Sequence, residues 1–132
     1  MMSRPRARVF IVEDDFLVAE SYRNTVDQLG YEVVGPSPSV EKALAVLEDE
    51  PVDVALLDVM LRGRVVTPVA RRLVDMGVPF IFLSGAAVRE VMGEEFRDAA
   101  VLEKPTERED LEETLRQAVS ERRRPSMPMP SD

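Results

Sequence analysis

The chain has 132 residues, enough for one domain of ordinary size, and 45% of them are hydrophobic, so it can bury a core. It has no cysteine and no histidine, which excludes disulfides, thiolate chemistry, a Ser-His-Asp triad and zinc held by histidine. The net charge of −8 disfavours binding to nucleic acid. Neither a membrane-spanning apolar run nor a secretory signal pattern is seen, so we expect a cytoplasmic location and no membrane partner.

The first part of the chain predicts two strands with a helix between them. Residues 9–12 form a short, continuous apolar run, as expected for a strand that is buried on both faces. Residues 16–29 have apolar side chains at helical spacing, and Asp15 is placed to cap the helix that they form. A shorter strand over 31–34 follows, and then a loop over 35–38 that contains glycine and proline.

The middle of the chain continues the same alternation. Ser39 can cap a second helix, and residues 52–57 predict a third, mainly apolar strand. The Arg-Gly-Arg sequence of residues 62–64 predicts a loop. Thr67 and Pro68 are typical of the N-cap and the first position of a third helix.

Two further strands and two helices complete the pattern. Residues 80–83 are wholly apolar and predict the fourth strand, and residues 99–102 predict the fifth. Between them, residues 86–96 predict a helix of low propensity, because it contains a glycine. Thr106 and Glu109 match a capping box at the start of the last helix.

Five strand–helix pairs with apolar strands predict an α/β fold with helices on both faces of a parallel sheet. We expect a flavodoxin-like, doubly wound, five-stranded parallel sheet with strand order 2-1-3-4-5 and five helices. This domain should extend over residues 7–122. A short extension over 1–6 precedes it, and a disordered tail rich in Pro, Ser and Met follows over 123–132.

Polar residues suited to phosphoryl chemistry follow four of the five predicted strands: Glu13 and Asp14, Asp58, Ser84, and Lys104. In the expected order the first and third strands are neighbours, so Glu13, Asp14 and Asp58 should meet in one crevice. Neighbouring carboxylates repel one another, and a divalent cation resolves the repulsion. Oxygen ligands without histidine or cysteine select Mg²⁺ or a similar ion, with the backbone carbonyl of Met60 as a further candidate ligand.

Asp58 is the best candidate for a nucleophile that accepts a phosphoryl group. Lys104 would then contact the phosphoryl oxygens as a point charge, and Ser84 would donate a hydrogen bond to another of them. Taken singly, Ser84 is equally compatible with a backbone hydrogen bond and Lys104 with a surface position. Their joint placement after neighbouring strands favours one shared site.

At these positions the chain resembles the receiver domain of response regulators (CheY-like), the phosphoacceptor of two-component signalling. The resemblance extends over residues 7–122 and includes the acid pair, the phosphoacceptor Asp58, the switch hydroxyl Ser84, and Lys104 followed by Pro105. The family usually has this Lys-Pro bond in cis. The resemblance implies that a sensor histidine kinase or a histidine phosphotransfer protein phosphorylates Asp58, and that Mg²⁺ is required. It also implies a signalling domain rather than an enzyme, with intrinsic autophosphorylation and autodephosphorylation, and a face at which receivers often form homodimers.

Three features depart from the usual receiver pattern. Val101 stands where receivers usually have Tyr or Phe, so the ring that normally turns inward on activation is missing. The stretch 61–64 lacks the common Pro-Gly loop. Residues 82–86, Phe-Leu-Ser-Gly-Ala, are similar to a variant subgroup of receivers with Phe-Ala-Thr-Gly, many of which are single-domain proteins. Gly85 beside Ser84 predicts a mobile loop at this place.

Two alternatives to a stand-alone signalling receiver stay open. A pseudo-receiver would have the same fold and bind a partner without phosphorylation, but the complete acid set and the lysine argue against it. A phosphatase of the haloacid-dehalogenase type also uses an aspartyl nucleophile, but Asp58-Val59-Met60 lacks the second acid of its motif. For the leading interpretation we expect the output to be a protein contact or onward phosphotransfer.

Overall fold

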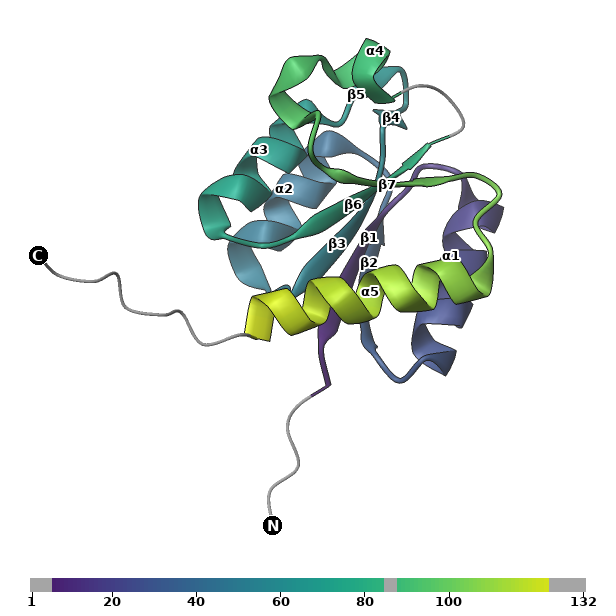
Figure 1. Ribbon diagram of the computed structural model, residues 1–132. Helices are drawn as coiled ribbons and strands as arrows, with labels where there is room; N and C mark the ends of the chain where they lie inside the picture. Colours follow the sequence, from purple (N-terminus) through teal and green to yellow (C-terminus); the bar gives the residue numbers. More distant parts are fainter. Residues whose placement is uncertain (1–5, 85–87, 124–132) are drawn as a thin grey trace, which may run out of the picture.

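The computed structural model describes residues 6–84 and 88–123, and its main feature is one parallel sheet of five strands in the order β2-β1-β3-β6-β7 (Figure 1). With the strands of this sheet numbered along the chain, the order is 2-1-3-4-5, so the predicted fold class is confirmed. The elements are β1 (Arg8–Val12), α1 (Phe16–Gln28), β2 (Glu32–Ser37), α2 (Val40–Asp49), β3 (Val54–Asp58), β4 (Met60–Leu61), β5 (Arg64–Val65), α3 (Thr67–Met76), β6 (Phe80–Ser84), α4 (Val88–Met92), η1 (Glu94–Phe96), β7 (Ala100–Glu103) and α5 (Arg108–Arg123).

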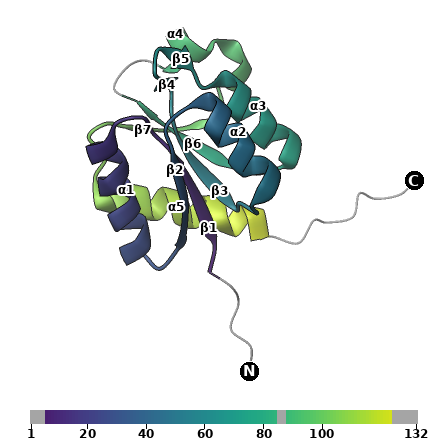
Figure 2. The same cartoon turned by 180° about the vertical axis from the view of Figure 1, so that it is seen from behind.

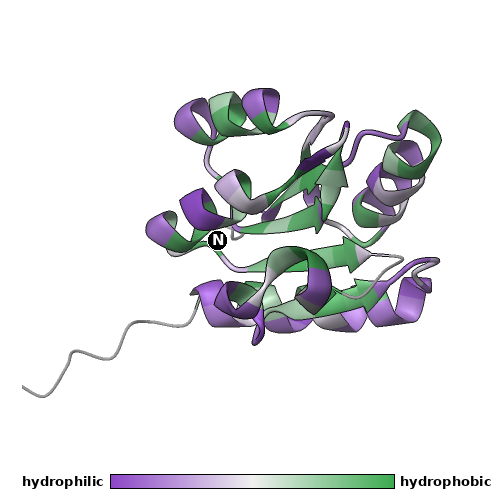
Figure 3. Ribbon diagram, turned by 90° about the horizontal axis from the view of Figure 1, so that it is seen from above, coloured by the Kyte–Doolittle hydropathy of each residue, from purple (hydrophilic) through white to green (hydrophobic). Residues whose placement is uncertain are grey.

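Helices cover both faces of the sheet. Helices α1 and α5 lie on one face, and α2 and α3 lie on the other (Figures 1 and 2). Along β1, Val9 and Ile11 pack in the core under α1 and α5, whereas Phe10 and Val12 pack in the core under α2 and α3. The strands are therefore apolar on both faces; in Figure 3 they are mainly green, whereas the helices contain both green, hydrophobic and purple, hydrophilic residues.

Several predicted helix ends are confirmed. The Asp15 side chain caps α1 by accepting hydrogen bonds from the backbone N–H groups of Leu17 and Val18. The Ser39 side chain caps α2 in the same way, by accepting from the Lys42 N–H. Because the Asp15 side chain serves as a helix cap, it has a different role from the preceding acid pair, Glu13 and Asp14.

Two segments predicted as loops are partly strands. β2 continues through Pro36 to Ser37, so the loop predicted over 35–38 is wrong for most of its length. Pro36 has no N–H to donate, and the sheet accommodates it because β2 is an edge strand. Arg62 and Gly63, also predicted as loop, form the two-residue turn of the β4–β5 hairpin; both have positive φ angles, 49° and 80°, as type I′ turns require.

The third and fourth helices also differ from the prediction. α3 begins at Thr67 with Val66 at the N-cap, so Thr67 and Pro68 each lie one position further into the helix than expected. Within the described part of residues 86–96, the short helix α4 is followed by the 3-10 turn η1. Gly93 separates them, because its φ of 77° lies outside the helical range.

Some predictions lie outside the described residues. Of the N-terminal extension only Arg6 is described, and of the predicted tail only Arg123, which is the last residue of α5. Gly85, which was predicted to make the loop after the fourth strand mobile, also lies outside the described residues.

Gly35 lies where β2 passes close to β1. Its φ is 83°, and a Cβ there would lie 2.8 Å from the Ile11 carbonyl oxygen. Gly30 has a similar φ of 95°, but no described atom lies within 4 Å of a Cβ at that position. We therefore expect Gly35→Ala to lower the free energy of unfolding by roughly 2 kcal/mol more than Gly30→Ala, as measured by urea denaturation. Equal losses in the two variants would contradict a steric role for the Ile11 contact.

Candidate functional site

The carboxyl ends of β1, β3 and β6 lie side by side at one edge of the sheet. Parallel pairing places Val12, the last residue of β1, beside Leu57, so the acid pair that follows β1 lies next to Asp58. Asp58 is paired in turn with Leu83 of β6, the residue before Ser84. The topology therefore brings residues from distant parts of the chain to one place.

Three carboxylates gather at this edge. Glu13, Asp14 and Asp58 each offer an oxygen, and these oxygens all lie within 4.8 Å of one another. Glu13 is buried, Asp58 is partly buried and Asp14 is exposed. Lys104 Nζ lies 2.6 Å from Glu13 Oε1 and 3.5 Å from Asp58 Oδ1. The lysine thus bridges two of the three acids and offsets part of their negative charge.

The electrostatic environment shifts the pKa values of these groups in different directions. Burial raises the pKa of Glu13 to about 7; the hydrogen-bonded Asp58 side chain adds to the rise, while Lys104 opposes it. Burial alone would lower the pKa of Lys104, but its hydrogen bond to Glu13 and the charge of Asp58 raise it overall. The hydrogen bond from the Arg62 backbone N–H lowers the pKa of Asp14. One lysine therefore does not neutralise the cluster.

The donor set fits a hard divalent cation such as Mg²⁺. All three side chains offer carboxylate oxygens, which Mg²⁺ prefers. Burial of Glu13 beside Asp58 disfavours the charged form of Glu13 and raises its pKa, and a divalent cation would stabilise that charged form. Met60 follows Asp58 by two residues, at the start of β4, and its carbonyl stays a predicted ligand.

We expect Mg²⁺ to raise the unfolding temperature more at about pH 8 than at about pH 6. Glu13 has to lose its proton to bind the cation, and its pKa is about 7. In the metal-free protein, stability should depend on pH in the opposite direction. The pKa of Glu13 is raised from 4.5 to about 7 in the folded state, so the stability that protonated Glu13 contributes is complete below pH 4.5 and is lost as the pH rises through about 7. Calorimetry with and without Mg²⁺ measures both trends, and an equal Mg²⁺ shift at the two pH values would contradict this role of Glu13.

Ser84 and Lys104 are linked through their backbones. The Lys104 N–H donates to the Ser84 carbonyl at 2.9 Å, across the pair formed by β6 and β7. Ser84 is buried at the carboxyl end of β6. The bond between Lys104 and Pro105 is cis, as the resemblance implies. The predicted phosphoryl-binding pair is therefore held at the carboxyl ends of two adjacent strands, with Ser84 the last residue of β6 and Lys104 the first residue after β7.

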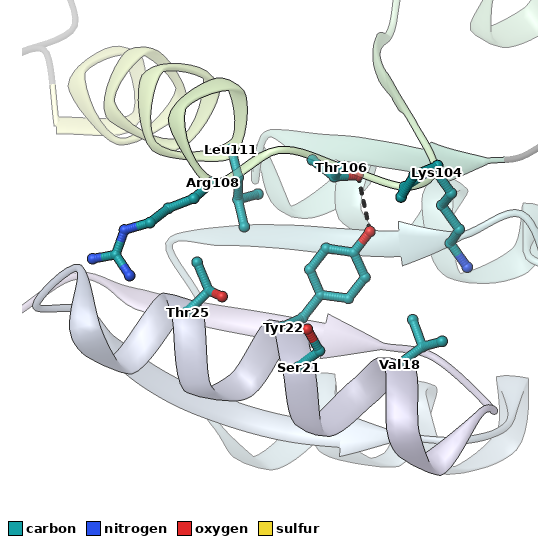
Figure 4. A pocket seen from close by; sticks show the side chains of 9 residues that line it. Val18, Ser21, Tyr22, Thr25, Lys104, Thr106, Arg108 and Leu111 are labelled. Carbon is teal, nitrogen blue, oxygen red and sulfur yellow. Dashed lines mark hydrogen bonds between the residues drawn. The ribbon is translucent and has the colours of Figure 1, made fainter.

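A pocket of about 500 Å³ lies between α1 and the segment that joins β7 to α5 (Figure 4). The hydroxyl oxygens of Tyr22 and Thr106 are 2.9 Å apart beside it, and the Thr106 hydroxyl also donates to the Glu103 carbonyl.

The predicted capping box is wrong, because α5 begins at Arg108 and Thr106 contacts α1 instead. The Tyr22 contact was missed because nothing in the local sequence pairs residues so far apart.

The hairpin after Asp58 makes another contact that the sequence analysis missed. The Arg62 backbone N–H donates to Asp14 Oδ2 at 2.8 Å. A sequence signal was present, since an Arg-Gly pair between short apolar segments is compatible with a two-residue hairpin turn. That pattern does not indicate which residue the hairpin turn would contact.

Comparison with known proteins identifies the family. A family model described as the response regulator receiver domain matches residues 9–116, well over half of the chain. The chain belongs to the response regulator receiver family. As a receiver it is a signalling domain of two-component systems rather than a classical enzyme, and receivers interact with histidine kinases or phosphotransfer proteins. Among curated proteins, none matches this chain.

Solved structures agree with this assignment. This receiver is 36% identical to SdrG from Sphingomonas melonis Fr1, with a TM-score of 0.76, over 86% of this chain and 97% of that chain. It is 34% identical to the BeF3-activated conformation of SdrG from Pseudomonas melonis Fr1, with a TM-score of 0.74, over 89% and 99% of the two chains. The response regulator PhyR from Brucella abortus is 30% identical, with a TM-score of 0.76, over 88% of this chain and 49% of that one, so this receiver spans about half of PhyR.

None of the described helices of this receiver is both long and apolar enough to cross a lipid bilayer.

Val101 on β7 is 42% exposed, so an apolar side chain occupies the surface position where many receivers have an aromatic ring.

Proposed function

We propose that this receiver accepts a phosphoryl group on Asp58 from a phosphohistidine donor, either a sensor histidine kinase or a histidine phosphotransfer protein. The observation that carries the proposal is the cluster of three carboxylates with Lys104 bridging Glu13 and Asp58. The 132 residues include no histidine, so the phosphohistidine does not lie among them.

In the transfer, a carboxylate oxygen of Asp58 attacks phosphorus and the N–P bond of the phosphohistidine breaks. The electron pair of that bond returns to the imidazole nitrogen, which takes up a proton from water. Lys104 and Ser84 donate to the phosphoryl oxygens and stabilise their charge. Mg²⁺, when held by Glu13, Asp14, Asp58 and the Met60 carbonyl, supplies further neutralisation of charge. In the later hydrolysis, water attacks phosphorus and the P–O bond to Asp58 breaks; the electron pair returns to the carboxylate, and inorganic phosphate and a proton are released.

The relatives support this proposal at one point. One structure of SdrG is described as BeF3-activated, and BeF3 resembles a phosphoryl group in shape and charge. By analogy, we propose that this receiver has an activated state formed at the same site. The resemblance of residues 82–86 to the Phe-Ala-Thr-Gly subgroup is consistent with an activation that does not use a ring on β7.

We further propose that the output is a protein contact or onward phosphotransfer in the cytoplasm. The valine at position 101 cannot perform the usual movement of an aromatic ring, so the segments next to Ser84 and Lys104 are the candidates for the readout. A partner responds to phosphorylation only if it binds the two states with different affinities.

The proposal is tested with phosphoramidate, a small donor whose P–N bond mimics phosphohistidine. In the presence of Mg²⁺ the chain should gain one phosphoryl group by intact mass spectrometry. If neither phosphoramidate nor a phosphorylated histidine kinase gives an adduct, a pseudo-receiver is favoured. Steady release of phosphate from a small phosphomonoester would instead favour a phosphatase.

A further inference from the structure

The turn of the β4–β5 hairpin contacts the acid cluster. The Arg62 backbone N–H donates to Asp14 Oδ2 at 2.8 Å, although the two residues are 48 positions apart. This hydrogen bond joins the loop after β1 to the segment after β3. The loop after β1 carries Glu13 and Asp14, β3 ends at Asp58, and the segment after β3 carries Met60, so the hydrogen bond links the parts of the chain that hold the candidate Mg²⁺ ligands.

Of the three acids, Asp14 depends most on a contact with another segment of the chain to fix the orientation of its side chain. It is exposed, whereas Glu13 is buried and Asp58 is partly buried. An exposed side chain on a loop samples several rotamers, and fixing one of them costs conformational entropy. A hydrogen bond from a backbone amide to a carboxylate is charge-assisted and selects one orientation. A carboxylate has two oxygens, so it can accept from the amide and still offer an oxygen to a cation.

Apolar packing holds the hairpin in place. Val59, Leu61 and Val66 are 3%, 1% and 0% exposed, and the Val66 N–H donates to the Val59 carbonyl at 2.8 Å. The ion pair of Arg64 with Glu41 also reaches α2, but both side chains are exposed, so it contributes little. The base of the hairpin is thus part of the core, and its turn has a defined position relative to Asp58.

The turn depends on two residues with positive φ. Arg62 has a φ of 49° and Gly63 a φ of 80°. No described atom lies within 4 Å of a Cβ at Gly63, so a larger residue there would strain the backbone without a steric clash. The turn can therefore be perturbed without changing any of the acids.

We propose that the β4–β5 turn is a positioning element of the Mg²⁺ site, in which the Arg62 backbone N–H orients Asp14 toward the cation. The inference rests on the proposed function, because it takes the acid cluster as the Mg²⁺ site. Arg62 acts through its main chain, so its guanidinium group is not required. Partners that orient metal ligands usually affect metal affinity by roughly tenfold to a hundredfold.

The test is the Mg²⁺ affinity of Gly63→Val, measured by calorimetric titration. We expect a loss of roughly tenfold to a hundredfold, with a smaller loss in the milder Gly63→Ala. Gly93→Val is the matched control, because Gly93 has a φ of 77°, no described atom lies within 4 Å of its Cβ position, and it separates α4 from η1. Arg62→Asn is the second control, since asparagine tolerates positive φ. Both controls should bind Mg²⁺ as the unsubstituted chain does.

Unchanged affinity in Gly63→Val would overturn the inference, and so would an equal loss in Gly93→Val. A loss in Arg62→Asn would assign the effect to the side chain and also overturn it. An independent readout needs no metal: Asp14→Ala should speed hydrogen exchange of the Arg62 amide, and unchanged exchange would contradict the contact. If the unsubstituted chain binds no Mg²⁺, the proposed function fails; if it binds and Gly63→Val binds equally, only this inference fails.

Discussion

Asp58→Asn is expected to carry no phosphoryl group after incubation with acetyl phosphate and Mg²⁺, whereas the unsubstituted chain gains one. The asparagine amide has nearly the same shape as the carboxylate, but it has no ionised oxygen to attack phosphorus. Asp58 lies at the end of a buried strand, 3.5 Å from Lys104 and within 4.8 Å of two other acids, so the substitution removes one charge and leaves the packing in place. Intact mass spectrometry measures the adduct directly.

Asp15→Asn is the matched control for this substitution. Asp15 adjoins the acid pair, but its side chain caps α1, and asparagine is an equally good N-cap. The Asp15 variant should therefore be phosphorylated as fully as the unsubstituted chain. An adduct of normal yield in Asp58→Asn would remove Asp58 from the role of acceptor.

Lys104→Ala is expected to be phosphorylated in part but to lose the conformational response. Lys104 is not the nucleophile, so transfer can continue at a reduced rate. Its ammonium group bridges Glu13 and Asp58, however, and it is the cation that we propose to contact the phosphoryl oxygens. In the variant, the Glu13 carboxylate loses its close cation. Because the Glu13 side chain is only 1% exposed, water cannot replace that cation, and the pKa of Glu13 should rise further.

The measurement compares hydrogen–deuterium exchange before and after phosphorylation. In the unsubstituted chain, exchange should change in the segment from Lys104 to the start of α5, and in Lys104→Ala it should not. Lys42→Ala is the control, because Lys42 is the other lysine of the chain and lies exposed on α2. An exchange response in Lys104→Ala equal to that of the control would exclude Lys104 from the switch.

The sheet could be predicted from the sequence because each strand is apolar and each is followed by a helix or a turn signal. Strands such as Val54–Asp58 are buried on both faces, and this burial produces the continuous apolar runs that identify them. Strand order followed from the topology expected for such a chain. The site followed from the order, since Asp14 follows the end of β1 and Asp58 ends the neighbouring strand β3.

The features that could not be predicted depend on contacts between distant residues. Gly35 and Pro36 are typical loop residues, but β2 continues through them at a register shift, and its pairing with β1 resumes at Ser37. Thr106 has the sequence of a helix cap, but its hydroxyl contacts Tyr22 on α1 instead. In both cases the tertiary structure outweighs the local conformational preference, and sequence patterns report only that local preference.

The location of the phosphoryl group tests the proposed function most directly. Borohydride reduces an aspartyl phosphate to homoserine, and tandem mass spectrometry of the resulting peptides then identifies the modified position. We predict that the chain treated with acetyl phosphate and Mg²⁺ is modified at Asp58 alone. Modification at Glu13 or Asp14, or a phosphoryl group that survives reduction on the Ser84 hydroxyl, would contradict the assignment of Asp58 as the acceptor.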